Sequence, residues 1–256
     1  MAAESRVGTG IVGLDAMLNG GFVRESAILV RGAPGTGKTT LALHYLLEGA
    51  KQGEPGLLIS FEEFPKSVYR DAESLGWDLA KSEADGSLRM MFTSPEVLLR
   101  SLEIPDSPLM KLLWDTQIAR VVVDSLSHFS RLRVDTFELR NIYNTIVNGF
   151  RREGLTSLFI GEETRDDFTS QEKGKLSFVV DCILMMRYLE IESSIRRAMF
   201  VLKMRSSDHD KSIHDFSIGI GGITVGKAME GHIGLLSGLS QHSMISTVQV
   251  ARKTKP

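Results

Sequence analysis

The chain has 256 residues, 42 % of them hydrophobic and 24 % charged, with a formal net charge of −2. This composition is typical of a globular protein, and the small net charge excludes a strong general attraction to nucleic acid or to an anionic membrane. The single cysteine, Cys182, excludes an internal disulfide framework, and its apolar neighbours in the sequence predict a buried, inert thiol.

Apolar runs of strand length alternate with segments of helical periodicity as far as residue 161. Residues 103–117 receive no assignment, because Pro105 and Pro108 interrupt the pattern. The alternation predicts an α/β fold with a mostly parallel central sheet and helices on both faces. The predicted strands are 27–31, 57–61, 88–92, 119–124 and 157–161, and the predicted helices are 14–18, 39–50, 65–75, 95–102 and 137–152.

Beyond residue 178, strand-like segments follow one another with short connections. No linker rich in proline or serine separates them from the first part, so we expect an antiparallel C-terminal extension of the same sheet. A single domain is therefore predicted over residues 1–230, and residues 231–256 are expected to form a tail that is mobile or makes contacts. The predicted late strands are 179–188, 196–204, 214–218 and 223–225.

Residues 32–39 read GAPGTGKT and match the pattern G-x-x-x-x-G-K-[ST] between a predicted strand and a predicted helix. Backbone N–H groups of such a loop surround an anion, while the lysine reaches the β- and γ-phosphates and the threonine hydroxyl coordinates Mg²⁺. The alternative is a glycine-rich turn that only precedes a helix. We expect ATP to be bound by Gly32, Pro34, Gly35, Thr36, Gly37, Lys38, Thr39 and Thr40.

Three acids follow predicted strands. Asp124 ends an apolar strand that we expect beside the strand of the phosphate-binding loop, which suits it to hold Mg²⁺ together with Thr39. Glu62 and Glu63 follow another strand, and the carboxyl ends of parallel strands face one crevice, so this pair is predicted to act on the attacking water. The alternatives are a turn-capping aspartate and two solvated loop glutamates.

Lys203 and Arg205 form a basic pair at the end of a late strand. Their spacing of two places both side chains on one face. Such a pair could neutralise charge on a transferring γ-phosphoryl group, commonly from a neighbouring subunit. From spacing alone, a solvated pair on an edge strand is the stronger interpretation.

Together these motifs resemble the KaiC-like ATPases of the RecA superfamily, over residues 8–225. Residues 9–21 (TGIVGLDAMLNGG) are similar to that family's lead-in to the phosphate-binding loop, and residues 60–63 (SFEE) to its paired catalytic glutamates. Residues 75–79 (LGWDL) follow at the family's usual interval. Residues 203–209 resemble its cross-subunit nucleotide-contacting segment.

The resemblance implies a RecA-like fold and a ring of identical subunits, most often a hexamer, with ATP and Mg²⁺ bound between subunits. Lys203 and Arg205 of one subunit would then reach the γ-phosphate on the next, which reverses the interpretation from spacing. Ser207 and His209 would also touch the neighbour's nucleotide; a surface histidine with no such task is the alternative for His209.

Some features depart from the family pattern. Residues 22–26 differ from its usual lead-in. The clock protein that gives the family its name has two ATPase domains of this kind, whereas this chain has one. At the autophosphorylated Ser-Thr pair of that protein this chain has Ser177 and Phe178, so we expect Ser177 to be a turn or strand residue, with a serine autokinase as an alternative function.

The leading interpretation is a ring-forming ATPase with a signalling or regulatory role and an unidentified protein partner. A DNA-dependent recombinase or helicase core is an alternative, but the expected loops at 125–136 and 162–176 mix acidic with basic residues, so nucleic acid is not the expected partner. The first residues do not resemble a secretion signal and no apolar run is long enough to span a membrane, so a cytoplasmic protein is expected.

Overall fold

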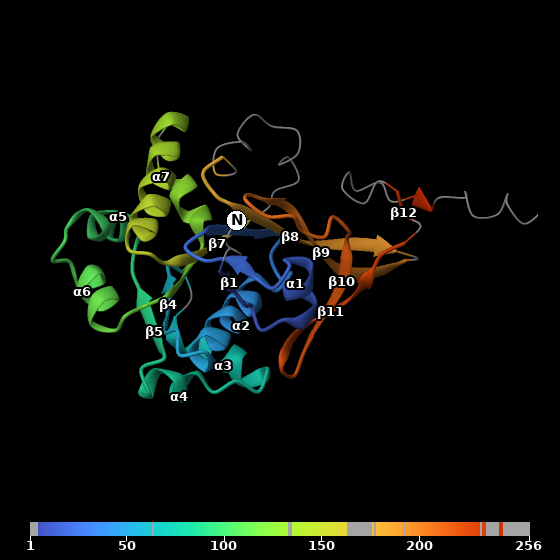
Figure 1. Cartoon of the computed structure of the whole chain (residues 1–256), viewed down its shortest axis with the longest axis horizontal. Helices are drawn as coiled ribbons and strands as arrows, with labels where there is room; N and C mark the ends of the chain where they lie inside the picture. Colours follow the sequence, from blue (N-terminus) through green and yellow to red (C-terminus); the bar gives the residue numbers. More distant parts are fainter. Residues whose placement is uncertain are drawn as a thin grey trace, which may run out of the picture.

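The fold is described from a computed structural model, over residues 5–62, 64–132, 135–162, 176, 178–191, 193–230, 232–233 and 241–242 (Figure 1). A nine-stranded sheet has the order β11-β10-β9-β8-β3-β7-β6-β4-β5. In chain order its strands are β3 (Ala27–Gly32), β4 (Gly56–Ser60), β5 (Leu88–Phe92), β6 (Arg120–Asp124), β7 (Thr156–Glu162), β8 (Cys182–Ile191), β9 (Ser194–Met204), β10 (His214–Gly219) and β11 (Gly222–Ala228).

Two short strand pairs lie outside this sheet. In the N-terminal pair β1 (Arg6–Val7) is antiparallel to β2 (Phe22–Val23), and in the other pair β12 (His232–Ile233) is antiparallel to β13 (Gln241–His242). The helices are α1 (Val12–Met17), α2 (Lys38–Lys51), α3 (Pro65–Ser74), α4 (Leu79–Ala84), α5 (Pro95–Glu103), α6 (Pro108–Asp115) and α7 (Thr136–Arg152), with a 3₁₀ helix η1 at Leu126–Arg131. Among the residues that the structure describes, no helix is both long enough and apolar enough to cross a bilayer.

The sheet confirms the predicted α/β architecture. Strands β8, β3, β7, β6, β4 and β5 are mutually parallel, and the antiparallel part begins where β8 pairs with β9. One expectation about strand order is wrong, because β7 lies between β3 and β6. The strand that ends in Asp124 is therefore two positions away from the strand of the phosphate-binding loop.

Helices cover both faces of the sheet, and alternate residues of each strand supply the two cores. Ile28 and Val30 of β3 belong to the core beneath α1 to α4, whereas Leu29 belongs to the core beneath α5 to α7 (Figure 1). Tyr45 of α2 and Phe150 of α7 are fully buried on these opposite faces. Cys182 is buried as predicted, and burial raises the pKa of its thiol to about 12.

The predicted helices of the first part are confirmed, but α4 and α6 were not predicted. Pro108, expected to interrupt the pattern, is the first residue of α6, and the Ser107 hydroxyl accepts a hydrogen bond from the Met110 N–H. A proline at this position costs no helix hydrogen bond, so it starts the helix. Strand β8 begins at Cys182, three residues later than predicted, after a turn at residues 178–179.

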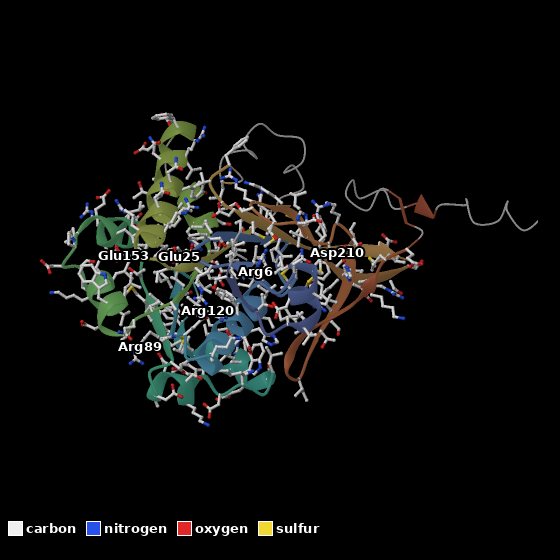
Figure 2. The ribbon with its side chains drawn as sticks, viewed as in Figure 1. Arg6, Glu25, Arg89, Arg120, Glu153 and Asp210 are labelled. Carbon is white, nitrogen blue, oxygen red and sulfur yellow. The ribbon has the colours of Figure 1, made fainter. Side chains whose placement is uncertain are left out.

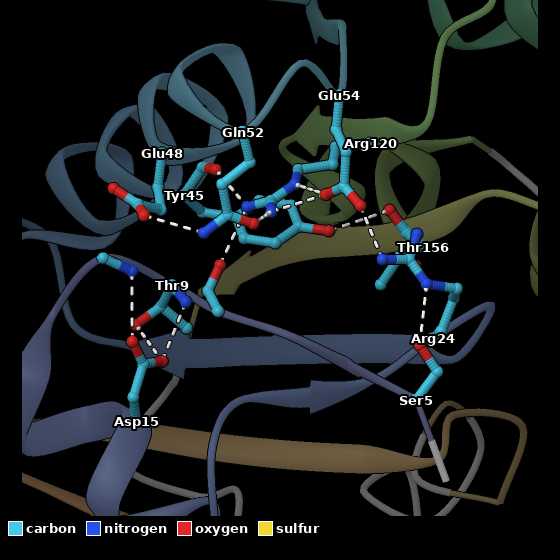
Figure 3. A network of polar contacts seen from close by, with 12 residues as sticks. Ser5, Thr9, Asp15, Arg24, Tyr45, Glu48, Gln52, Glu54, Arg120 and Thr156 are labelled. Atoms are coloured by element: carbon cyan, nitrogen blue, oxygen red, sulfur yellow. Dashed lines mark hydrogen bonds and ion pairs between the residues drawn. The ribbon is translucent and has the colours of Figure 1, made fainter.

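A buried arginine joins four segments at the end of the sheet where β6 begins. Arg120 is 0 % exposed and its guanidinium donates to Gly8 O (2.8 Å), Tyr45 O (2.9 Å), Gln52 Oε1 (3.0 Å) and Glu54 Oε2 (2.6 and 2.8 Å) (Figure 3). These contacts tie the N-terminal lead-in to the last turns of α2 and to β6. All five guanidinium N–H donors are therefore used without water.

Candidate functional site

The predicted phosphate-binding loop connects β3 to α2, and its shape depends on glycine. Gly35 and Gly37 have φ of +77° and +102°, in the left-handed region, and Gly37 is the N-cap of α2. A Cβ on Gly32 would lie 2.3 Å from Met186 O of β8. Pro34 and Gly35 form the exposed tip of the loop. The loop therefore has the open turn at a helix N-terminus that suits an anion.

The lysine of the motif is folded back over the loop. Lys38 Nζ donates to Gly32 O and Ala33 O, both at 2.9 Å. Thr36 is buried and its hydroxyl also donates to Ala33 O, at 2.9 Å. Thr40 is half-buried in the first turn of α2. The structure thus gathers the eight predicted loop residues around the start of one helix.

Asp124 at the end of β6 meets Thr39 in the first turn of α2, although β6 and β3, the strand before the loop, are not neighbours. The Thr39 hydroxyl donates to Asp124 Oδ2 at 2.9 Å. Burial raises the pKa of Asp124, and the hydrogen bond from Thr39 and the charge of Lys38 only partly oppose this. A hydroxyl beside a carboxylate is an all-oxygen donor set of the kind that Mg²⁺ prefers, so the residues present fit this metal.

Glu62 lies at the same edge of the sheet, just past β4. The Phe61 N–H donates to Asp124 O at 3.1 Å, which fixes the end of β4 against the end of β6. Glu62 Oε1 is 2.9 Å from Nε2 of His128, a residue of η1 that is not among the predicted site residues. Its position four residues after Asp124, in the loop that leaves the same edge, is the signal that could have indicated it. Glu63 lies outside the described residues.

Two further side chains from distant strands lie against the loop. Tyr188 of β8 donates through its hydroxyl to Gly35 O at 2.5 Å. Ile218 of β10 approaches Gly37 so closely that a Cβ there would lie 2.4 Å from its Cδ1. The sequence gives no signal for these contacts, since Tyr188 and Gly35 are 153 positions apart.

Lys203 and Arg205 point toward the same short segment, as their spacing predicts. Lys203 Nζ donates to Val180 O at 2.7 Å, and Arg205 Nη2 donates to Phe178 O at 2.8 Å. Burial lowers the pKa of Lys203, and the positive charge of Arg205 adds to that effect. The two cations therefore lie side by side at the start of β8.

This basic pair is remote from the phosphate-binding loop of its own chain. Met186 of β8 pairs with Gly32, where the loop begins. Val180, which accepts from the Lys203 ammonium, lies before the first residue of β8, and from Cys182 to Met186 that strand extends over roughly 13 Å. The structure thus separates the predicted site into two groups of residues at opposite edges of the sheet. One group lies at the carboxyl ends of the parallel strands and the other at their amino ends.

The two remaining predicted residues lie beyond the end of β9. Ser207 Oγ accepts a hydrogen bond from Arg6 Nη2 at 2.6 Å. His209 Nδ1 is buried and has no hydrogen-bond partner among the residues described. Ser177 and most of the loop at 162–176, on which the kinase and DNA alternatives depend, lie outside those residues.

Comparison with known proteins identifies the family of this chain. The family model described as "ATPase: KaiC" matches residues 7–230. The chain is 34 % identical over 242 residues to the circadian clock oscillator protein KaiC of Rippkaea orientalis, covering 93 % of this chain and 45 % of the relative. It is 33 % identical over 258 residues to the circadian clock protein KaiC3 of Synechocystis sp., covering 97 % and 49 %. The chain spans about half the length of these curated relatives, and it belongs to the KaiC ATPase family.

Proposed function

We propose that this chain is a cytoplasmic regulatory ATPase that assembles into a ring, most simply a hexamer, with Mg-ATP bound between adjacent subunits. The observation that carries the proposal is the separation of the site. The phosphate-binding loop, Asp124 and Glu62 lie at one edge of the sheet, whereas Lys203 and Arg205 lie at the other. A complete site then requires the edges of two chains.

At the first edge, each residue has a separate task. The loop N–H groups and Lys38 hold the phosphates, and Thr39 with Asp124 holds Mg²⁺, which when bound neutralises charge on the phosphoryl oxygens. Glu62 orients the attacking water and accepts its proton, and His128 fixes the Glu62 carboxylate at 2.9 Å. Glu63 is proposed to share the task of Glu62.

At the second edge, the cations serve the neighbouring subunit. Lys203 and Arg205 add positive charge beside the γ-phosphoryl group bound there, and Ser207 and His209 contact the same nucleotide. Contact between two different edges is head-to-tail, and such interfaces close into rings when the rotation permits. A regulatory role is supported by the clock proteins among the relatives, whose names describe them as oscillator or clock proteins.

The test removes the water-directing carboxylates without disturbing nucleotide binding. In the double variant Glu62→Gln with Glu63→Gln, phosphate release should fall about 10²–10⁴-fold. ATP should remain bound after desalting, and the mass by light scattering with Mg-ATP should stay that of the ring. A control variant, Glu73→Gln with Glu103→Gln, removes two exposed carboxylates elsewhere and should keep its turnover.

Two results would reject parts of this proposal. Unchanged turnover in the Glu62 and Glu63 variant would remove these residues from the chemistry. A monomeric mass with and without Mg-ATP would reject the shared site.

A further inference from the structure

The turn that follows β9 has a backbone conformation that needs support. Ser206 has φ of +61°, in the left-handed region, where a residue with a Cβ is unfavourable. Such a conformation persists when surrounding contacts hold it. The turn stands directly between Arg205 and Ser207, so its shape decides how residues 203–209 leave the sheet.

The contact next to this turn comes from the N-terminal strand pair. Arg6 of β1 donates through Nη2 to Ser207 Oγ at 2.6 Å, and through Nη1 to Gly21 O at 3.3 Å and Leu18 O at 3.4 Å. The Ser207 hydroxyl then donates to Asp208 O at 2.8 Å. One planar guanidinium therefore fastens the lead-in and the turn together, which a single ammonium could not do in the same geometry.

Two more hydrogen bonds hold the next residues on the lead-in. Asn19 Nδ2 donates to Asp208 O at 2.9 Å, and the Asp210 N–H donates to Met17 O at 2.9 Å. Before the turn, by contrast, the segment rests on residues 178–181. The N-terminal part of the chain thus holds residues 207–210, and the residues before β8 hold Lys203 and Arg205.

The same lead-in is anchored to the helix of the chain's own phosphate-binding loop. Arg120 donates to Gly8 O and to Tyr45 O of α2 (Figure 3). In the view of Figure 2, Arg6 lies between Arg120 and Asp210. The lead-in therefore contacts both the later turns of α2, away from the loop, and the segment at residues 203–210.

We propose that Arg6 is a positioning residue, which holds Ser207 so that residues 203–209 are presented to the neighbouring subunit in an active shape. This rests on the proposed sharing of the nucleotide site. Arg6 acts through Ser207 and needs no contact with nucleotide itself. Its loss should therefore damage the site that the segment completes on the next subunit and spare the site formed by its own loop.

The first test compares variants within pure rings. Arg6→Ala should lower ATP turnover about 10- to 100-fold, because small displacements of a positioned group have effects of this size. Arg6→Lys, which keeps the charge but not the planar set of donors, should fall in the same direction and covers the case in which Arg6→Ala does not fold. Arg24→Ala is the matched control, since Arg24 follows the same strand pair but contacts Ser5 and Glu54. An equal loss in Arg24→Ala would overturn the proposal.

The second test asks on which side of the interface Arg6 acts. Arg6→Ala subunits with an intact loop are co-expressed with Lys38→Ala subunits that keep an intact segment. In random mixed rings about a quarter of the interfaces combine the two intact halves, so turnover should rise to about a quarter of wild type. If Arg6 served its own loop, no interface would be complete and turnover would stay low, which would overturn the proposal.

A parallel mixture separates failure of this inference from failure of the shared site. Lys203→Ala subunits mixed with Lys38→Ala subunits should regain activity in the same way. Recovery here without recovery for Arg6→Ala would reject the role of Arg6 alone. No recovery in either mixture would reject the shared site and the inference together.

Discussion

The Asp124 carboxylate, at the end of β6, loses its hydration on burial and gains few contacts that compensate for this loss. The Thr39 hydroxyl and the Lys38 charge favour its ionised form, but burial and the nearby charge of Glu62 raise its pKa above the usual 3.8. The stability that a protonated Asp124 gives is full below pH 3.8 and is lost as the pH rises through the raised pKa. At neutral pH, the nucleotide-free protein therefore carries an unfavourable charge at the proposed metal site.

Asp124→Asn should separate stability from function. Without nucleotide, the variant should be more stable than wild type at neutral pH, and the difference should shrink toward pH 3.8 because the asparagine does not ionise. Its Mg²⁺-dependent turnover should fall about 10- to 100-fold. Urea unfolding at several pH values and phosphate release measure the two effects. Asp106→Asn, which removes an exposed carboxylate, is the control, and a less stable Asp124→Asn at neutral pH would contradict the argument.

The sequence predicts the residues of this site better than their partners. Asp124 and Glu62 could be placed near one another because both end parallel strands, whose carboxyl ends share one edge. His128 could not be assigned to Glu62 because the path of η1 is decided by packing against the sheet. For the same reason Tyr188 and Ile218, whose strands are far from the loop in the sequence, have no local signal that predicts these contacts.

At the scale of elements, the sequence predicts long periodic helices and fails where one residue type has two uses. Pro108 ends a pattern in most contexts, but after the capping Ser107 it begins α6. Asp78 is likewise the N-cap of α4, a helix too short to show a period. The position of β7 between β3 and β6 could not be predicted, since buried parallel strands are apolar throughout and carry no record of their neighbours.

The contacts of Arg120, the first residue of β6, predict that the stability of the fold depends strongly on this one side chain. Arg120→Met should lower the free energy of unfolding by about 3 kcal/mol, because the buried oxygens of Gly8 and Tyr45 lose their donor. Arg24→Ala, which breaks a more exposed ion pair with Glu54, should cost at most about 1 kcal/mol. Urea unfolding of both variants measures the difference, and equal losses would show that the buried network is not the cause.

At the scale of the whole molecule, the two edges of the sheet differ in chemistry. One edge offers the phosphate-binding loop, and the other offers Lys203 and Arg205. Because these surfaces lie at opposite ends of the strands and neither is complementary to itself, a contact between them is head-to-tail. A subunit with one damaged edge should therefore still join an assembly through its other edge and stop further addition.

Lys203→Glu with Arg205→Glu tests this directionality by reversing the charge of one edge. Alone with Mg-ATP, the variant should remain small, because its segment repels the phosphates of the next subunit. Added to wild type, it should lower the mass of the assemblies, since each variant subunit joins through its intact loop and blocks the following position. Sedimentation velocity measures both results. Arg100→Glu with Lys111→Glu reverses two exposed cations on α5 and α6 and should leave assembly unchanged. A mixture that keeps the full wild-type mass would mean that this edge does not form the contact.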